Sequence, residues 1–211
     1  MEPQFWHDRW AKNEIGFHKG EANPFLVTYF HELALAKSSR VFVPLCGKTL
    51  DIHWLLSKGY RVAGAELSTL AIEQLFAELG VTPTITRAGG LNKYSTDNLD
   101  IFGGDIFHLS KQMLGPVNAI YDRAALVALP PDMRVRYTTH LTELTDHAPQ
   151  LLICYEYDQR VMDGPPFSIS NEEVLQHYQH RYTVRHMTSI DVPGGFKGKC
   201  PATEHVWLLR K

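Results

Sequence analysis

The 211-residue sequence has few cysteines, and no two of them lie close together. Cys46, Cys154 and Cys200 are odd in number and widely spaced, which argues against a disulfide framework and a Cys-x-x-Cys metal site. No apolar run approaches the ~20 residues that span a bilayer, and the opening MEPQFWHDRW lacks the apolar core of a signal peptide. We therefore expect a cytoplasmic protein that makes no use of a membrane.

A strong net charge is also lacking. The 21 Lys and Arg residues are balanced by 23 Asp and Glu residues, which leaves a formal charge of -2. Nucleic-acid binding normally requires a basic surface, so a small-molecule partner is the better expectation. A hydrophobic content of 44% in a chain of this length is enough for one core. We expect a single domain over residues 1–211 that acts as a monomer.

Short β-branched runs alternate with helical patterns along the chain. Because the strands are apolar on both faces, the pattern predicts an α/β fold with a mostly parallel sheet covered by helices. Residues 86–98 and 163–168 are expected to be irregular loops. Strands are expected within 40–45, 60–67, 99–107, 118–129, 150–158, 182–192 and 204–211, and helices at 49–59, 68–80, 132–144 and 170–178.

Gly47, Lys48 and Thr49 follow the first strand and resemble the end of a phosphate-binding loop. That pattern requires another glycine five residues before Gly47, but Phe42 occupies this position within the strand. The dinucleotide pattern requires about three glycines, and only Gly47 is present. A ligand without a pyrophosphate is therefore favoured. The alternative is that Gly47 simply ends a strand.

Glu66 ends the second strand about 20 residues after the first loop, where related folds place an acid that binds ribose hydroxyls. A carboxylate suits this role because both of its oxygens accept hydrogen bonds. With a one-glycine loop, Glu66 indicates an adenosine-type ligand without a diphosphate, and S-adenosylmethionine is the obvious candidate. The alternative for Glu66 is an exposed surface residue.

Four segments then carry a resemblance to the thiopurine S-methyltransferase family, in matching order and spacing over nearly the whole chain. They are residues 5–18 (FWHDRWAKNEIGFH), 41–68, 122–130 (DRAALVALP) and 163–168 (DGPPFS). The resemblance implies the class I S-adenosylmethionine-dependent methyltransferase fold, with a seven-stranded sheet and helices on both faces. All strands would be parallel except one near the C-terminus, within the hairpin of 182–192 and 204–211.

The resemblance also implies an activity. Members of this family methylate thiopurines and other aromatic or heterocyclic thiols, and related bacterial proteins are associated with methylation of selenium or tellurium compounds and with tellurite resistance. Two other classes stay open. An NAD-dependent oxidoreductase is disfavoured by the single glycine at Gly47. A non-catalytic sensor of an adenosine ligand would keep the pocket without turnover.

Site residues follow from the resemblance, position by position. Residues 1–20 would form a lid over the cofactor, with Trp10 as part of the cover and Phe17 against the acceptor ring. The Leu45 backbone would lie beside the methionine moiety, and Glu66 would hold the ribose hydroxyls. Asp105 and Ile106 would bracket the adenine, although some relatives have a smaller polar residue in place of Asp105. The implied cofactor contacts are Trp10, Leu45, Glu66, Asp105, Ile106 and Arg123, and the implied acceptor contacts are Phe17 and Arg123.

Methyl transfer from a sulfonium to sulfur needs aligned, dry reactants and requires neither a metal nor a covalent protein intermediate. Arg123 would orient and stabilise the acceptor thiolate, so no other catalytic residue is assigned. The alternative for Arg123 is an ion pair with Asp122. Cys46 is expected to be a buried structural thiol. His177 and His180 lie one helical turn apart, but without a third ligand we expect a solvated helix face.

Overall fold

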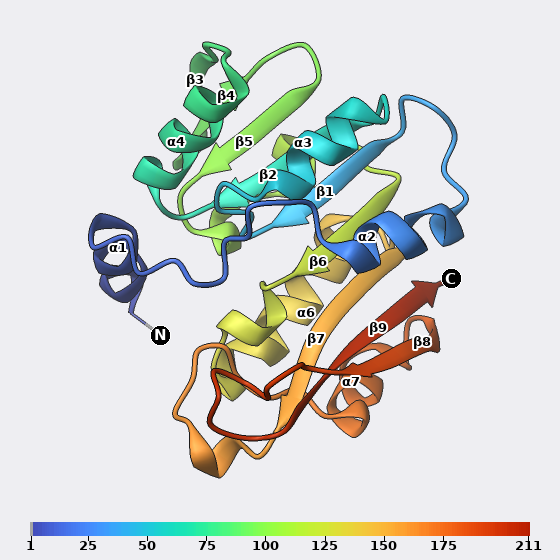
Figure 1. Cartoon of the computed structure of the whole chain (residues 1–211). Helices are drawn as coiled ribbons and strands as arrows, with labels where there is room; N and C mark the ends of the chain where they lie inside the picture. The colour runs from blue at the N-terminus through green and yellow to red at the C-terminus, as the bar shows by residue number, and fades with distance from the viewer. Residues whose placement is uncertain (1) are drawn as a thin grey trace.

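The computed structural model describes residues 2–211, and five parallel strands form the middle of its sheet (Figure 1). Their order is β5-β2-β1-β6-β7 within the full order β3-β4-β5-β2-β1-β6-β7-β9-β8. Their side chains are mostly buried on both faces, which explains why they read as near-continuous apolar runs. The five strands are β1 (Arg40–Pro44), β2 (Arg61–Glu66), β5 (Leu99–Gly103), β6 (Ala119–Arg123) and β7 (Gln150–Tyr157).

The C-terminal hairpin forms as predicted. β9 (Ala202–Arg210) runs antiparallel to β7 and to β8 (Thr183–Asp191), so β9 reverses direction at this end of the sheet. The pairing is long, from Gln150 opposite Leu209 to Tyr157 opposite Ala202. This end of the sheet therefore has the arrangement that the resemblance implied.

The other end of the sheet corrects the prediction. Residues 86–98 were expected to be an irregular loop, but β3 (Thr84–Ala88) and β4 (Leu91–Ser95) form an antiparallel hairpin, and β4 also pairs antiparallel with β5. The sheet of the described residues thus has nine strands rather than seven. The sequence pattern did not predict this hairpin because its strands carry little apolar signal. β3 is exposed along nearly its whole length and shows no apolar alternation, and β4 buries only Leu91 and Tyr94.

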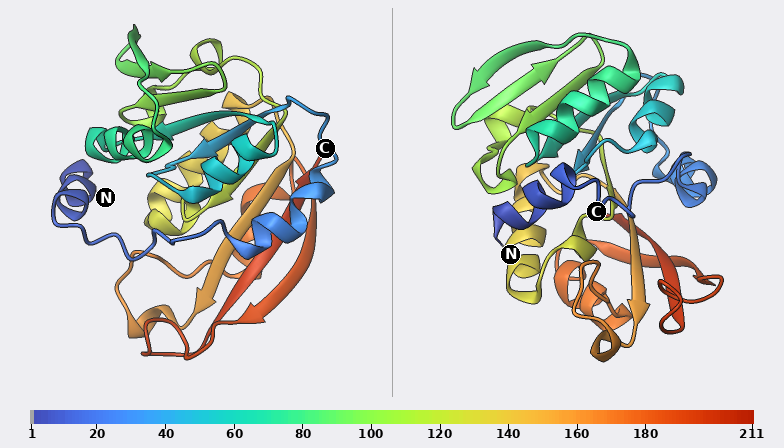
Figure 2. Two further views of the ribbon diagram at one scale, coloured as in Figure 1. Left: turned by 45° about the horizontal axis from the view of Figure 1, so that its top comes forward. Right: turned by 60° about the vertical axis from the view of Figure 1, so that its left-hand side comes forward.

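Helices cover both faces of the sheet (Figure 2). One face packs against α2 (Pro24–Tyr29), α3 (Leu50–Ser57) and α4 (Thr69–Leu79). The opposite face packs against α5 (Lys111–Leu114), α6 (Pro131–Leu144) and α7 (Asn171–Tyr178). The four predicted helices agree with α3, α4, α6 and α7 to within two residues at each end. The remaining helical segments are α1 (Pro3–Ala11), η1 (Phe30–Leu33), η2 (Ile106–His108), η3 (Leu126–Ala128) and η4 (Gln159–Val161).

Local capping explains where the predicted helices start and stop. The Ser68 hydroxyl accepts the backbone N–H of Ala71 at 3.3 Å, and Gly80 ends α4 with a left-handed φ of 68°. The Ser170 hydroxyl accepts the backbone N–H of Glu173 at 3.2 Å at the start of α7.

None of the helices within residues 2–211 is long and apolar enough to span a bilayer.

Candidate active site

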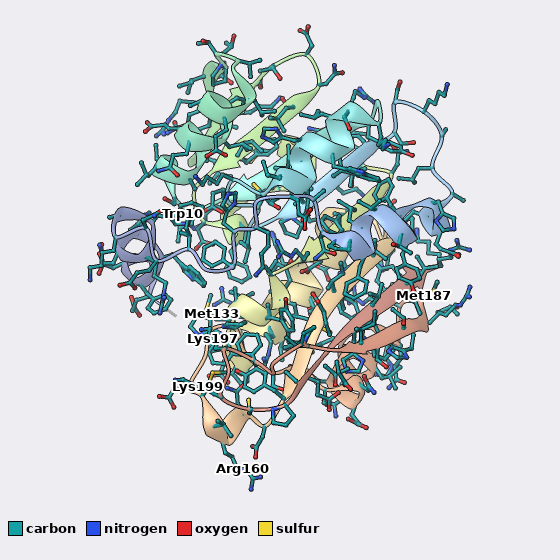
Figure 3. All side chains as sticks on the ribbon, in the orientation of Figure 1. Trp10, Met133, Arg160, Met187, Lys197 and Lys199 are labelled. Carbon is teal, nitrogen blue, oxygen red and sulfur yellow. The ribbon has the colours of Figure 1, made fainter. Side chains whose placement is uncertain are left out.

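A cavity of about 660 Å³ lies where the central parallel strands end. Side chains from both ends of the chain meet there. Figure 3 shows Trp10 of α1, Met133 of α6 and Lys197 of the β8–β9 connection around this region. The structure brings all the predicted site residues together, since the lining includes Trp10, Phe17, Leu45, Glu66, Asp105, Ile106 and Arg123.

The loop after β1 has a backbone that only some residues tolerate. Leu45 and Gly47 have left-handed φ angles of 45° and 52°. A side chain at Gly47 would also meet the Trp10 ring, because a Cβ there would lie 3.0 Å from Trp10 Cζ2. Gly47 therefore does more than end a strand: it lets a buried indole close directly over the loop.

Glu66 is buried rather than on the surface, with 5% of its area exposed. Its Oε2 accepts the Gly47 N–H at 2.7 Å, and its Oε1 accepts the Ser68 N–H at 2.8 Å. Burial raises the pKa of Glu66, and hydrogen bonds from the backbone of Ser68, Gly47 and Leu67 oppose that rise. The carboxylate is thus fixed between the ends of β1 and β2, where each oxygen accepts a backbone N–H and the residue lines the cavity.

Asp105 and Ile106 follow β5 next to Glu66. The backbone N–H of Gly104 donates to the Glu66 carbonyl at 2.9 Å, which ties this segment to the end of β2. The Asp105 carboxylate caps η2 by accepting the Phe107 N–H at 3.0 Å, and Ile106 is buried. An acid and an aliphatic side chain therefore stand together in the lining of the cavity.

Arg123 ends β6 with a side chain that is 10% exposed. Its Nη2 donates to the Phe17 carbonyl at 3.3 Å, and its Nη1 lies 3.9 Å from Asp51 Oδ2. The predicted alternative, a pair with Asp122, is wrong, because neighbouring strand residues point to opposite faces. Asp122 is fully buried and accepts the Tyr137 hydroxyl at 2.6 Å.

Sequence reasoning missed Asp51, which holds this part of the site. Asp51 is almost fully buried in the first turn of α3. It accepts the Asn23 N–H at 2.6 Å and the Tyr121 hydroxyl at 3.0 Å, and it faces Arg123. A carboxylate on the apolar face of helix 49–59 was the available signal, since buried charges normally have partners.

An aromatic cluster of the N-terminal segment lines the cavity. The Phe17 ring lies edge-on to Trp6 and Trp10, with ring centroids 6.0 and 5.7 Å apart. Such contacts exclude water, and the faces of aromatic rings attract cations. Tyr155 and Phe196 also line the cavity, and burial raises the pKa of Tyr155 to about 12.

The remaining residues considered for chemistry, Cys46 and His177, have environments typical of structural residues. Burial raises the pKa of Cys46 well above its ordinary value, and Glu66 adds to the shift, so this thiol stays protonated, as expected of a structural residue. Within residues 2–211, no three His, Cys, Asp or Glu side chains form a group suited to a metal. His177 is a correction: it was predicted on a solvated face, but it is only 9% exposed and pairs with Glu173 at 3.2 Å.

Comparison with known proteins places the chain in a family. The family model for Thiopurine S-methyltransferase (TPMT) matches residues 1–211. A thiopurine S-methyltransferase of Xanthobacter autotrophicus is 59% identical over 212 residues and covers 100% of both chains. Another from Teredinibacter turnerae is 48% identical over 211 residues, covering 100% of this chain and 98% of its own.

Solved structures agree on the fold. A Burkholderia thailandensis 1,6-didemethyltoxoflavin-N1-methyltransferase, solved with S-adenosylhomocysteine, is 14% identical, with a TM-score of 0.66 over 99% of this chain and 87% of its own. An S-adenosylmethionine-dependent methyltransferase from Anabaena variabilis gives a TM-score of 0.62 at 15% identity over 99% and 95% of the two chains. The fold is that of S-adenosylmethionine-dependent methyltransferases, and the chain belongs to the thiopurine S-methyltransferase family of S-adenosylmethionine-dependent enzymes.

Proposed function

We propose that this protein transfers a methyl group from S-adenosylmethionine to the sulfur of thiopurines and other aromatic or heterocyclic thiols. The observation that carries the proposal is that the buried Glu66 carboxylate, Arg123 and Phe17 all line one cavity. In addition, the Arg123 guanidinium donates a hydrogen bond to the Phe17 carbonyl. The carboxylate suits a nucleoside, and a guanidinium in a cavity that aromatic residues also line suits a planar anion.

The residues present fit this cofactor. Gly47 leaves no side chain between the β1 loop and the cavity, and the Trp10 ring occupies the space that a Cβ would need. Glu66 would bind the ribose hydroxyls, and the Leu45 backbone would lie beside the methionine end. Asp105 and Ile106 would bracket the adenine. We assign these contacts because all these residues line the one cavity.

When bound, S-adenosylmethionine supplies a methyl group on a positively charged sulfur. The Trp6, Trp10 and Phe17 rings would shield this charge from water and attract it through their faces. Arg123 would stabilise the attacking thiolate, so that the thiol proton is released to solvent before transfer. A fixed guanidinium and a dry aromatic wall then supply most of what an in-line displacement requires.

Residues 2–20 of the predicted lid are within the described chain, and Trp10 and Phe17 of this segment line the cavity, which supports the prediction. We propose that this segment closes when cofactor binds. Hydrogen exchange of residues 5–20 tests this: their amides should exchange more slowly with S-adenosylhomocysteine present. Unchanged exchange would rule out the lid.

Binding and product measurements test the proposed function itself. Calorimetry should show that S-adenosylhomocysteine binds and NAD does not. Mass spectrometry after incubation with a panel of thiols, selenite and tellurite should show methylated aromatic thiols, and it also decides whether selenium or tellurium compounds are acceptors. NAD binding would favour an oxidoreductase, and S-adenosylhomocysteine binding without any product would favour a sensor.

The setting of the enzyme is part of the proposal. A reducing cytoplasm suits Cys46, Cys154 and Cys200, which are all free and buried. The near-neutral charge supports a small molecule rather than a nucleic acid as the partner. We also propose that residues 1–211 act as one domain and as a monomer, which size-exclusion chromatography with light scattering would check.

A further inference from the structure

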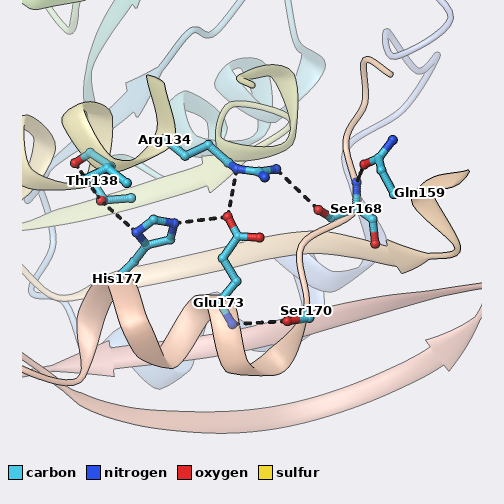
Figure 4. A network of polar contacts seen from close by, with 8 residues as sticks. Arg134, Thr138, Gln159, Ser168, Ser170, Glu173 and His177 are labelled. Carbon is cyan, nitrogen blue, oxygen red and sulfur yellow. Dashed lines mark hydrogen bonds and ion pairs between the residues drawn. The ribbon is translucent and has the colours of Figure 1, made fainter. Parts of the chain in front are cut away.

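Arg134 is a buried cation that lies outside the cavity. It is in the first turn of α6, and its side chain is only 6% exposed. A guanidinium cannot release its charge at ordinary pH, so such a residue must be paired. Its Nε lies 2.8 Å from Glu173 Oε1 on α7, and its Nη1 donates to the Ser168 carbonyl at 3.3 Å (Figure 4).

Both partners are themselves held in place. Glu173 Oε1 also contacts His177 Nε2 at 3.2 Å, which fixes the carboxylate from the next turn of α7. The Ser168 N–H donates to Gln159 Oε1 at 2.7 Å, and its hydroxyl accepts the Tyr157 N–H at 2.9 Å. Arg134 therefore joins α6, α7 and the segment after β7 in one network (Figure 4).

The segment that Arg134 holds, residues 163–168, forms part of the cavity wall. Pro165 and Pro166 line the cavity. Phe167 lies behind them: its N–H donates to the Val127 carbonyl at 2.6 Å, and its ring centroid lies 5.8 Å from the Arg134 guanidinium carbon. The guanidinium thus supports the wall from its outer side without entering the cavity.

This wall belongs to the half of the cavity away from the proposed cofactor contacts. Leu45 and Asp105 follow β1 and β5, and Glu66 ends β2, whereas residues 163–168 follow β7 on the other side of β6. Since Arg123 ends β6, it stands between the two halves. The β7 side is therefore where an acceptor would contact the wall.

We propose that Arg134 and Glu173 are positioning residues for the methyl acceptor, because together they hold Phe167 and Ser168 and so fix Pro165 and Pro166 in the cavity wall. The inference rests on the proposed methyl transfer to a thiol. It predicts that breaking the Arg134–Glu173 pair widens or loosens the acceptor half and leaves the cofactor half intact.

The test compares Arg134→Met with a matched control, Arg181→Met. Arg181 also links α6 to the chain after α7, through Glu143 at 3.6 Å, but this pair is exposed and lies outside the network of contacts described above. Arg134→Met should raise the KM for an aromatic thiol about tenfold with a smaller change in kcat, because a displaced wall misorients the acceptor. The Kd for S-adenosylhomocysteine should stay within about twofold, and Arg181→Met should change neither constant.

A second readout does not depend on turnover. The Phe167 amide is hydrogen bonded to Val127, so its hydrogen exchange reports whether the wall opens. We expect faster exchange in Arg134→Met and wild-type exchange in Arg181→Met. If wild-type protein methylates no thiol but this exchange result holds, the proposed acceptor is wrong, whereas the proposed support of residues 163–168 by Arg134 and Glu173 is correct.

Milder variants keep the test decisive if Arg134→Met does not fold. Glu173→Gln removes the charge of the pair, and Arg134→Lys keeps a cation that cannot reach both Glu173 and Ser168 in a fork. Both should shift the acceptor KM and the Phe167 exchange in the same direction, by smaller amounts. Unchanged Phe167 exchange and acceptor KM in the folded variants, or equal increases in acceptor KM and cofactor Kd, would overturn the proposal.

Discussion

The Arg123 guanidinium donates to the main-chain carbonyl of Phe17, a residue 106 positions earlier in the chain. The same guanidinium faces Asp51, which accepts the backbone N–H of Asn23. The segment from Phe17 to Asn23 is therefore tied to Arg123 directly at Phe17 and through Asp51 at Asn23. Arg123 therefore lines the cavity and also holds the N-terminal segment at Phe17.

Replacing Arg123 with Met should reduce kcat/KM for an aromatic thiol by about a hundredfold, since a fixed cation next to the reacting anion is lost. The apparent pKa of the acceptor thiol in the pH profile should rise as well, because the thiolate loses its stabilising charge. Arg160→Met is the control, since Arg160 is exposed and pairs only locally with Asp158. Unchanged acceptor kinetics in Arg123→Met would exclude the proposed role.

Replacing Glu66 with Gln should weaken S-adenosylhomocysteine binding by about tenfold to a hundredfold, because a charged acceptor of hydrogen bonds is lost. The amide would also turn an N–H group toward Gly47 or Ser68, both of which donate to the native carboxylate. Calorimetry measures the change, with the exposed Glu73→Gln on α4 as the control. Equal affinity for both variants would remove Glu66 from the cofactor site.

Gly47→Ala and Gly80→Ala form a matched pair, because both glycines have left-handed φ angles but only Gly47 is crowded. Each should lower the free energy of unfolding by about 1 kcal/mol from backbone strain. Gly47→Ala should in addition displace Trp10 and weaken cofactor binding, since its Cβ would lie 3.0 Å from the indole. Urea unfolding and calorimetry separate the two effects. Wild-type cofactor affinity in Gly47→Ala would show that the Trp10 contact is dispensable.

Asp122 should make the protein less stable as pH rises through the weakly acid range. Burial raises its pKa from 3.8 to about 6, so the folded chain holds a proton where the unfolded chain has released it. Its stabilising contribution is therefore full below about pH 4 and is lost as pH rises to about 6, by about 3 kcal/mol at ~1.4 kcal/mol per pKa unit.

The Asp122→Asn variant isolates this contribution, because an amide does not titrate. Between pH 4 and 7, the free energy of urea unfolding of the variant should rise relative to wild type. Asp132→Asn, at an exposed position in α6, is the control variant, because it removes a carboxyl without touching the buried one. A flat difference between Asp122→Asn and wild type would mean that the buried carboxyl keeps its ordinary pKa.

Much of the fold and site could be predicted because the signals were local. Glu66 and Arg123 end apolar strands, and parallel strands bring such ends to one edge of a sheet. The hairpin of β3 and β4 lacked this signal, since β3 carries almost no buried side chains. Its pairing depends on the edge of β5, which no local pattern reveals.

The polar networks were the harder part. Asp51 and Arg134 each depend on partners distant in the sequence, such as Asn23 for Asp51 and Ser168 for Arg134. Asp122 was considered as the partner of Arg123 because they are adjacent, yet alternation along β6 separates them. Residues that support a site from behind are thus found through tertiary contacts rather than motifs.

Leu45 and Ala124 hold left-handed backbone angles of 45° and 63° directly after β1 and β6, the two central strands that border the cavity. Glycine would adopt these angles at lower energy, so Ala124→Gly would relieve backbone strain in the folded protein. The chain instead keeps a side chain at both turns. Engineering this enzyme for stability should therefore begin away from these two turns, because a side chain there restricts the backbone where the ligand is expected to bind.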